Sequence, residues 1–140
     1  MSYATLTDLI DRAGDAEMRQ IADRDRDTVI DQAVVDAALV HADNLVNGYV
    51  GAKYDVPLAT VPDLVRTWAV SIARYILHRN GAPEHVAQDY KDAVASLKDV
   101  AAGRIALPVA AGADPLPTSG GQVMASHPDE VFTADKLRGW

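Results

Sequence analysis

The sequence predicts an all-α fold, a small helical bundle of three main helices with short helices before it and an extended arm after it. Apolar residues recur at three- and four-residue steps in segments 31–50, 62–80 and 83–103, the period that aligns side chains on one face of a helix. Glycine or proline stands at the end of each segment and at the start of the second and third, where helices end and begin. Beyond residue 103 small residues, Gly and Pro prevail, which indicates an extended segment without a core of its own.

Two short helices are expected at the N-terminus. Thr5 is a preferred N-cap, Asp8 lies favourably in the first turn, and Gly14 ends the first helix. Asp15 can cap a second short helical turn. The apolar sides of both consist of Leu6, Leu9, Ile10, Ala13, Met18 and Ile21. Residues 23–28 are fully polar and predict an exposed connection.

The helix of residues 31–50 and the corner after it come next. The apolar stripe of this helix contains Val35, Ala38, Leu39, Ala42, Leu45, Val46 and Tyr49. Pro57 and Pro62 oppose helix formation in the corner, residues 51–62. Tyr54 and Leu58 are the side chains expected to fix this corner to the core.

The helix after Pro62 is the centre of the predicted fold. Its apolar positions are Leu64, Val65, Trp68, Ala69, Ile72, Ala73, Ile76 and Leu77. Because this stripe is wide, neighbouring helices must cover the central helix on more than one side. Pro62 is expected in its first turn, while Gly81 and Pro83 prevent its continuation.

The last helix runs from Pro83 to Gly103, so we divide the chain into a helical domain, 1–103, and a C-terminal arm, 104–140. Its apolar positions are Val86, Tyr90, Ala93, Val94, Leu97 and Val100. The alternating residues 104–109 suggest a short strand, confined to a sheet edge by Pro108. Large apolar residues at the end of the arm are expected to bind a partner or to pack back on the parent domain. The candidate binding residues are Val131, Phe132, Leu137, Arg138 and Trp140.

The composition excludes several classes of protein. A chain of 140 residues fits one domain with a core of its own. The net charge of -7 disfavours nucleic-acid binding through a basic face. No apolar run is long enough for a membrane span, and the acidic N-terminus does not resemble an export signal. The chain has no cysteine, so disulfides, thiol catalysis and Cys-based zinc sites are excluded.

Acidic residues between the first helices and residue 31 invite a calcium interpretation, because carboxylates at alternate positions can surround one ion. These residues are Asp23, Asp25, Asp27 and Asp31. An EF-hand loop beginning at Asp23 would need Gly and Glu at its sixth and twelfth positions, where this chain has Thr28 and Val34. A solvated loop without metal is therefore favoured.

Catalytic motifs are not evident. The four histidines, His41, His78, His85 and His127, lack the spacing of metal ligands. No serine lies in a nucleophile elbow, and no glycine-rich loop follows a strand. Only scattered Asp and His residues would support an enzyme, so the prediction is a protein without catalytic activity, metal or cofactor.

The central helix has a narrow polar side that carries Arg66, Arg74 and His78. Such a stripe is most often exposed to solvent, with ion pairs to nearby acids. It also suits a subunit contact, because arginine is enriched at the interfaces of oligomers. The first interpretation is favoured, and the second makes these three residues candidates for a subunit interface.

Several segments in order resemble one family, the small head–tail connector or adaptor proteins of long-tailed bacteriophages, in particular those of Mu-like prophages. The N-terminal segment is MSYATLTDLIDRAGDAEM, and the corner segment is NGYVGAKYDVPLATVPDLVR. The later segments are IARYILHR, YKDAVASLKDVAAGRIALP and the ending FTADKLRGW. The resemblance covers nearly the whole chain and is weakest in residues 110–122.

The resemblance implies a structural protein of the phage neck, made in the cytoplasm of the host bacterium and located at the head–tail junction of the virion. Such adaptors form a homo-oligomeric ring, typically of twelve copies, which joins the portal to the next neck or tail protein and continues the DNA channel. Their C-terminal arms clasp the portal, a role that Phe132, Leu137, Arg138 and Trp140 would fill here. A cytosolic helical protein-binding module, such as a regulator or an antitoxin-like partner, is the alternative.

Overall fold

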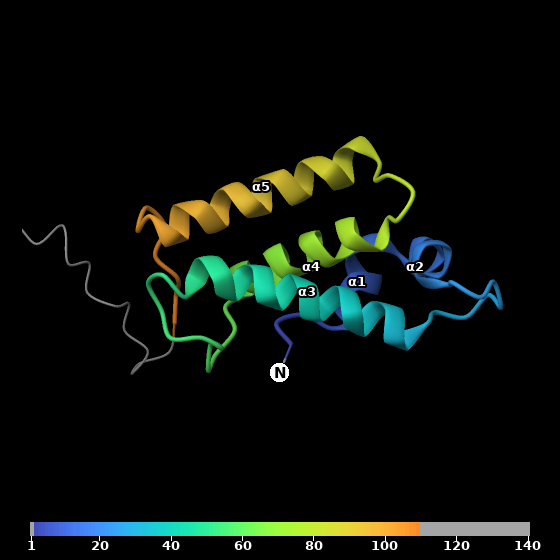
Figure 1. Cartoon of the computed structure of the whole chain (residues 1–140), viewed down its shortest axis with the longest axis horizontal. Coiled ribbons are helices and arrows are strands. Elements are labelled where there is room, and N and C mark those ends of the chain that lie inside the picture. Colours follow the sequence, from blue (N-terminus) through green and yellow to red (C-terminus); the bar gives the residue numbers. More distant parts are fainter. Residues whose placement is uncertain (1, 110–140) are drawn as a thin grey trace, which may run out of the picture.

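The computed structural model describes residues 2–109, and these form a bundle of five helices (Figure 1). The helices are α1 (Leu6–Ala13), α2 (Asp15–Ala22), α3 (Gln32–Val50), α4 (Asp63–Leu77) and α5 (Glu84–Ala101). No strand occurs within residues 2–109. The all-α prediction is confirmed for this part of the chain. None of these helices is both long and apolar enough to cross a membrane.

Helix α4 lies at the centre of the bundle. It packs against α3 and α5, its neighbours in the sequence, and the short helix α1 lies against it as well. Helix α2 packs on α1 and α3 and reaches α4 through the ion pair of Glu17 with Arg74. Trp68, predicted to lie in the core, is only 6% exposed, and Ile72 is fully buried. Because other parts of the bundle pack on several sides of α4, Val70, Ser71 and Arg74 are also buried, although they lie outside the predicted apolar stripe. Leu64, placed in that stripe by its spacing, is instead 41% exposed in the first turn.

The helix ends follow the local chemistry of the sequence. Thr5 caps α1 through a capping box, in which Thr5 and Asp8 exchange side-chain and backbone hydrogen bonds. Gly14, with φ of 90°, ends α1 and is also the N-cap of α2. Pro62 is the N-cap of α4 and not a residue of its first turn, because its ψ of 148° is extended.

The corner of residues 51–62 is fixed to the bundle, as predicted. The side chains of Tyr54 and Leu58 are both buried in the core. Tyr3 adds a contact from the N-terminal segment, since its hydroxyl accepts a hydrogen bond from the backbone N–H of Leu58 (3.0 Å) and donates one to Asn47 Oδ1. The corner is therefore held by two tyrosines from different parts of the chain.

The prediction of a short strand near residues 104–109 is wrong. Leu107 is buried, and its backbone N–H donates to the Tyr54 hydroxyl (2.8 Å), so a side chain provides the partner that a neighbouring strand would have provided. Gly103 turns the chain with φ of 80° after α5, as its position predicted. The first residues of the expected arm thus pack on the bundle.

Candidate functional site

The three polar residues of the central helix lie in different surroundings. The side chain of Arg66 is 46% exposed and pairs weakly with Asp63 (3.4 Å). The side chains of Arg74 and His78 are each only 10% exposed, because α2 covers them. Their polar groups face Glu17 within the same chain. Arg66 is the most exposed of the three, and the role of these residues in a subunit contact stays a prediction.

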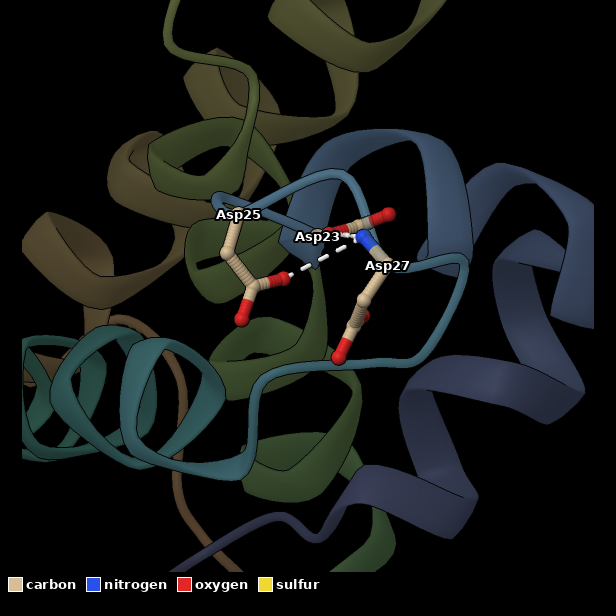
Figure 2. Close-up of side chains that lie close together, drawn as sticks. All are labelled: Asp23, Asp25 and Asp27. Carbon is tan, nitrogen blue, oxygen red and sulfur yellow. Dashed lines mark hydrogen bonds between the residues drawn. The ribbon is translucent and has the colours of Figure 1, made fainter.

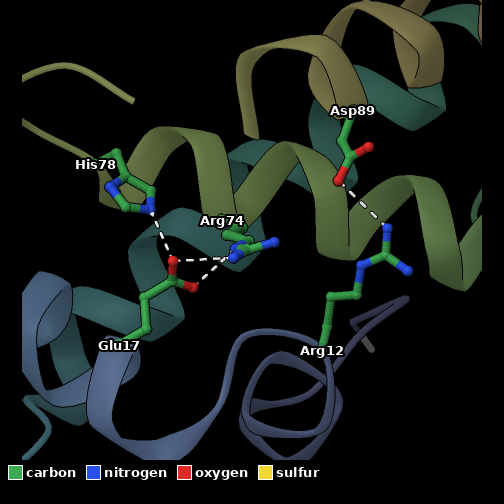
Figure 3. Close-up of polar contacts among 5 residues, drawn as sticks. All are labelled: Arg12, Glu17, Arg74, His78 and Asp89. Carbon is green, nitrogen blue, oxygen red and sulfur yellow. Dashed lines mark hydrogen bonds and ion pairs between the residues drawn. The ribbon is translucent and has the colours of Figure 1, made fainter. Parts of the chain in front are cut away.

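Glu17 is the centre of this buried polar cluster (Figure 3). It lies in the first turn of α2, which begins directly after the turn at Gly14 and so directs the carboxylate toward α4. Both oxygens accept hydrogen bonds from Arg74, from Nε at 2.8 Å and from Nη2 at 2.9 Å. Such a two-point contact between guanidinium and carboxylate is among the stronger polar contacts in proteins. It joins α2 to α4 across 57 residues of sequence.

His78 completes the cluster at the C-terminal end of α4. Its Nε2 atom lies 3.6 Å from Glu17 Oε1, is buried, and has no hydrogen-bond partner in the described part of the chain. Burial lowers the pKa of His78 below its ordinary value, and Arg74 lowers it further against the opposing effect of Glu17. The imidazole is therefore neutral at neutral pH, when it does not add a second cation to the cluster.

The pKa of Glu17 is set by competing effects. Burial raises this pKa, but the hydrogen bonds and positive charge of Arg74 outweigh burial, so the pKa lies below its ordinary value. The carboxylate is ionised at neutral pH and both of its oxygens are occupied by Arg74. A carboxylate bound in this way is a poor general base, so the cluster is suited to joining helices.

A cavity of about 360 Å³ lies beside the cluster, where α2 meets the end of α4. Its lining includes Gln20, Arg24, Arg79 and Gly81 together with Glu17 and His78. Arg24 reaches from the loop after α2 and donates to the carbonyl oxygen of Leu77 (3.4 Å). Figure 3 shows the His78 ring directed at Glu17, so its buried Nε2 atom faces the polar cluster.

The N-terminal helices are also tied to α5. Arg12 at the end of α1 forms an ion pair with Asp89 of α5 at 3.2 Å (Figure 3). Both side chains are partly exposed, and ion pairs in such surroundings contribute little stability. Arg12 therefore supports the position of α1, while Glu17 and Arg74 make the stronger connection.

The acidic loop between α2 and α3 brings Asp23, Asp25 and Asp27 together (Figure 2). One carboxylate oxygen from each lies within 4.8 Å of the others. The Asp23 carboxylate accepts hydrogen bonds from the backbone N–H groups of Arg26 (2.6 Å), Asp27 (3.2 Å) and Thr28 (2.8 Å). This acid therefore organises its own loop, and the solvated loop without metal stays a prediction.

Hydrogen bonds within the loop also govern Asp31 and the pKa values of Asp23 and Asp25. Asp31, the fourth acid of the predicted set, accepts a hydrogen bond from the Arg24 backbone N–H at 2.7 Å and acts separately from the other three. Desolvation raises the pKa of Asp23, but its backbone hydrogen bonds, led by the one from Thr28, bring the pKa below the usual value. The pKa of Asp25 is raised, chiefly by its hydrogen bond with Asp23.

The exposed apolar side chains of the described bundle include Val40 and Tyr75. Val40 on α3 is 55% exposed, beside a groove of about 470 Å³ between α3 and the end of α4 whose lining includes Ala37 and Ile76. Tyr75 of α4 stacks on Tyr90 of α5, with ring centroids 4.2 Å apart, and Tyr75 is partly exposed. Apolar and aromatic side chains of this kind are common at the centres of protein interfaces.

Sequence reasoning missed Glu17 and the hydroxyl group of Tyr54. Glu17 carried only one signal, its place in a first helical turn, which does not identify a partner 57 residues away. The predicted partner-binding residues of the arm lie outside the described residues; they are Val131, Phe132, Leu137, Arg138 and Trp140.

The chain is similar to proteins of Mu-like phages over most of its length. A family model described as Bacteriophage Mu, Gp36 matches residues 3–126. The Mu-like prophage FluMu protein gp36 of Haemophilus influenzae is 34% identical over 124 residues, which cover 89% of this chain and 88% of that protein. Gene product J of Escherichia phage Mu is 30% identical over 105 residues, 74% of each chain.

Proposed function

Because the chain belongs to the bacteriophage Mu Gp36 family, we propose that this Mu-like phage protein is a structural component of the virion neck. It forms an oligomeric adaptor ring that joins the portal to the next head–tail connector or tail protein and continues the DNA channel. The ring contains twelve copies, as in the adaptors that the sequence resembles. The protein is made in the host cytoplasm and is built into the head–tail junction.

The family match over residues 3–126 is the observation that carries this proposal. The match contains all five helices, three of the five segments on which the resemblance to head–tail connectors rests, and the first segment from residue 3 onward. The polar residues buried in the bundle support the proposal, because Glu17 and Arg74 join helices and do not surround a reaction centre. A rigid body with exposed apolar side chains such as Val40 is well suited to assembly.

The charge of the chain also supports a place beside packaged DNA. A channel wall formed by copies with a net charge of -7 repels phosphate groups, whereas a basic wall would hold them. The genome can therefore slide past such a wall without binding it. No sequence-specific contact with DNA is required for this role, and the protein needs no cofactor for it.

Co-elution with the purified portal ring of the same phage genome tests the proposal. The full chain is compared with a chain that ends at Val109, since this variant keeps every residue that packs in the described bundle. We expect the full chain to travel with the portal and the shortened chain to remain folded but unbound. Circular dichroism of the shortened chain provides the control for folding.

Two outcomes would change the proposal. If both chains bind, the helical body makes the contact and the role given to the residues of the arm is wrong. If neither binds and the full chain stays a monomer or dimer, the adaptor proposal is wrong. The alternative, a cytosolic helical protein-binding module, then becomes the better description.

A further inference from the structure

The corner of residues 51–62 and the exit segment, residues 104–109, lie at the same end of the bundle (Figure 1). The order of the helices requires this, because α3 ends at the corner, α4 returns from it, and α5 runs back toward it. The loop after α2 and the connection between α4 and α5 lie at the other end. Helix α3, with 19 residues, is about 28 Å long, so the two ends are well separated.

Tyr54 joins the exit segment to the corner. Its hydroxyl accepts the hydrogen bond from Leu107 N–H at 2.8 Å, and both residues are buried. Upstream, the backbone N–H of Arg104 donates to the Asp99 carbonyl oxygen at 2.8 Å, and the Arg104 guanidinium binds the Asp99 carboxylate at 2.9 Å. The chain is thus held at two points between α5 and Val109, and its path over residues 104–109 is fixed.

The Tyr54 contact is specific because it satisfies a buried backbone donor. A buried N–H without a partner is costly, and Leu107 has no neighbouring strand to supply one. The corner itself is held from its other side by Tyr3, through the N–H of Leu58. The exit segment therefore packs on the corner of residues 51–62, and Tyr3 holds this corner without help from the exit segment.

The surface around this end offers groups for a protein partner. Val56 is 39% exposed in the corner. A cavity of about 510 Å³ lies next to the corner, with Thr60 and Arg66 in its lining. Within residues 2–109 the Arg66 guanidinium pairs only with Asp63, through an exposed 3.4 Å contact that leaves donors for a partner carboxylate.

On the premise of the proposed function, we propose that the bundle end formed by residues 51–62 and 104–109 faces the portal, and that Tyr54 is a positioning residue for the arm. A tether that starts beside the partner raises the effective concentration of the arm residues there. An arm that started at the opposite end would first have to cross the length of the bundle. The arm then binds the portal on the side that this end of the bundle faces.

Single-cysteine cross-linking tests which end faces the portal. The chain has no cysteine of its own, so a benzophenone label on one introduced residue reports one position only. Asp55→Cys places the label in the corner, and the matched control Asn80→Cys places it on an exposed residue at the opposite end. We expect the label at residue 55 to cross-link to the portal and the label at residue 80 not to. Equal cross-linking, or cross-linking from residue 80 alone, overturns the proposed orientation.

Tyr54→Phe tests the positioning role, since it keeps the ring and removes the acceptor for Leu107. We expect portal binding about tenfold weaker, with helix content little changed. The matched control is Tyr75→Phe, which alters a partly exposed ring. A label at Lys136→Cys adds a second readout, because loss of positioning should spread its cross-links over more portal peptides. An unchanged cross-link pattern and affinity in Tyr54→Phe would refute the positioning role.

The two proposals fail in different ways. If the unaltered full chain does not co-elute with the portal, the proposed function is wrong. If the full chain binds but residues 55 and 80 cross-link alike, the function stands and only the inferred orientation is wrong. Should Tyr54→Phe prove unfolded, the cross-linking pair with Tyr54 intact still decides the orientation.

Discussion

Replacing Glu17 by Gln should destabilise the bundle more than any other exchange of one charged side chain for a neutral one in α2. The substitution keeps the size of the side chain but removes the charge that Arg74 binds at 2.8 and 2.9 Å. Arg74 would remain a cation under the cover of α2, with its side chain only 10% exposed. A buried charge that loses its partner is strongly destabilising.

The expected loss in the free energy of unfolding is about 2–3 kcal/mol. Breaking a fully buried pair costs about 3–5 kcal/mol, and the lower figure applies because the Glu17 side chain retains 20% of its exposure to water. The matched control is Arg19→Gln, also in α2, which breaks the pair with Asp15. Those two side chains are more than half exposed, so the control should lose less than about 0.5 kcal/mol.

Urea titration followed by circular dichroism measures these differences. A double-mutant cycle with Arg74→Met isolates the interaction, since the double variant leaves no unpaired charge. We expect a coupling of at least about 1 kcal/mol, with the double variant more stable than Glu17→Gln alone. If Glu17→Gln costs no more than Arg19→Gln, the cluster does not hold α2 to α4 and the reasoning is refuted.

Three further predictions concern the core, the pH dependence and the first helix. Trp68→Ala should cost about 3–5 kcal/mol in a urea titration, because Trp68 is 6% exposed at the centre of the bundle; a loss below about 1 kcal/mol would contradict this packing. Stability should fall as the pH drops below 6.5, since the unfolded chain takes up a proton at His78 that the folded chain, with its lowered pKa, resists. A second fall in stability should follow below pH 4.5 as Glu17 loses its charge. His78→Asn should abolish only the first fall. An unchanged pH profile of this variant would count against the assignment of the first fall to His78. Thr5→Ala should lower the stability of the bundle by about 1 kcal/mol through loss of the capping box with Asp8, and an unchanged melting temperature would show that α1 does not depend on its cap.

The helices could be predicted from the sequence because their signals are local. The spacing of apolar residues located α3, α4 and α5, and the cap at Thr5 and the turn at Gly14 located α1 and the start of α2. The burial of Trp68 followed from the width of the apolar stripe. Each of these inferences needs only residues a few positions apart, which is the range over which helix geometry acts.

The polar cluster could not be predicted because it depends on contacts between distant residues. The spacing that aligned Arg74 and His78 on one side of α4 could not show that α2 covers that side. The conformation of the exit segment also depends on a long-range contact. The backbone N–H of Leu107 donates to the hydroxyl of Tyr54, and no strand forms there. Local propensity alone does not decide such competition between partners.

The central place of α4 has a consequence for the order in which the bundle can assemble. Helices α3, α4 and α5 contact their neighbours in sequence, so they can collapse together with a small loss of loop entropy. Helices α1 and α2 precede α4 in the chain, yet the residues that hold them, such as Arg74, follow much later. During synthesis from the N-terminus, α1 and α2 therefore leave the ribosome before the surface on which they dock has been made. The first helices to leave the ribosome are therefore not the first that can dock, because Arg74 and the rest of α4 are made after them.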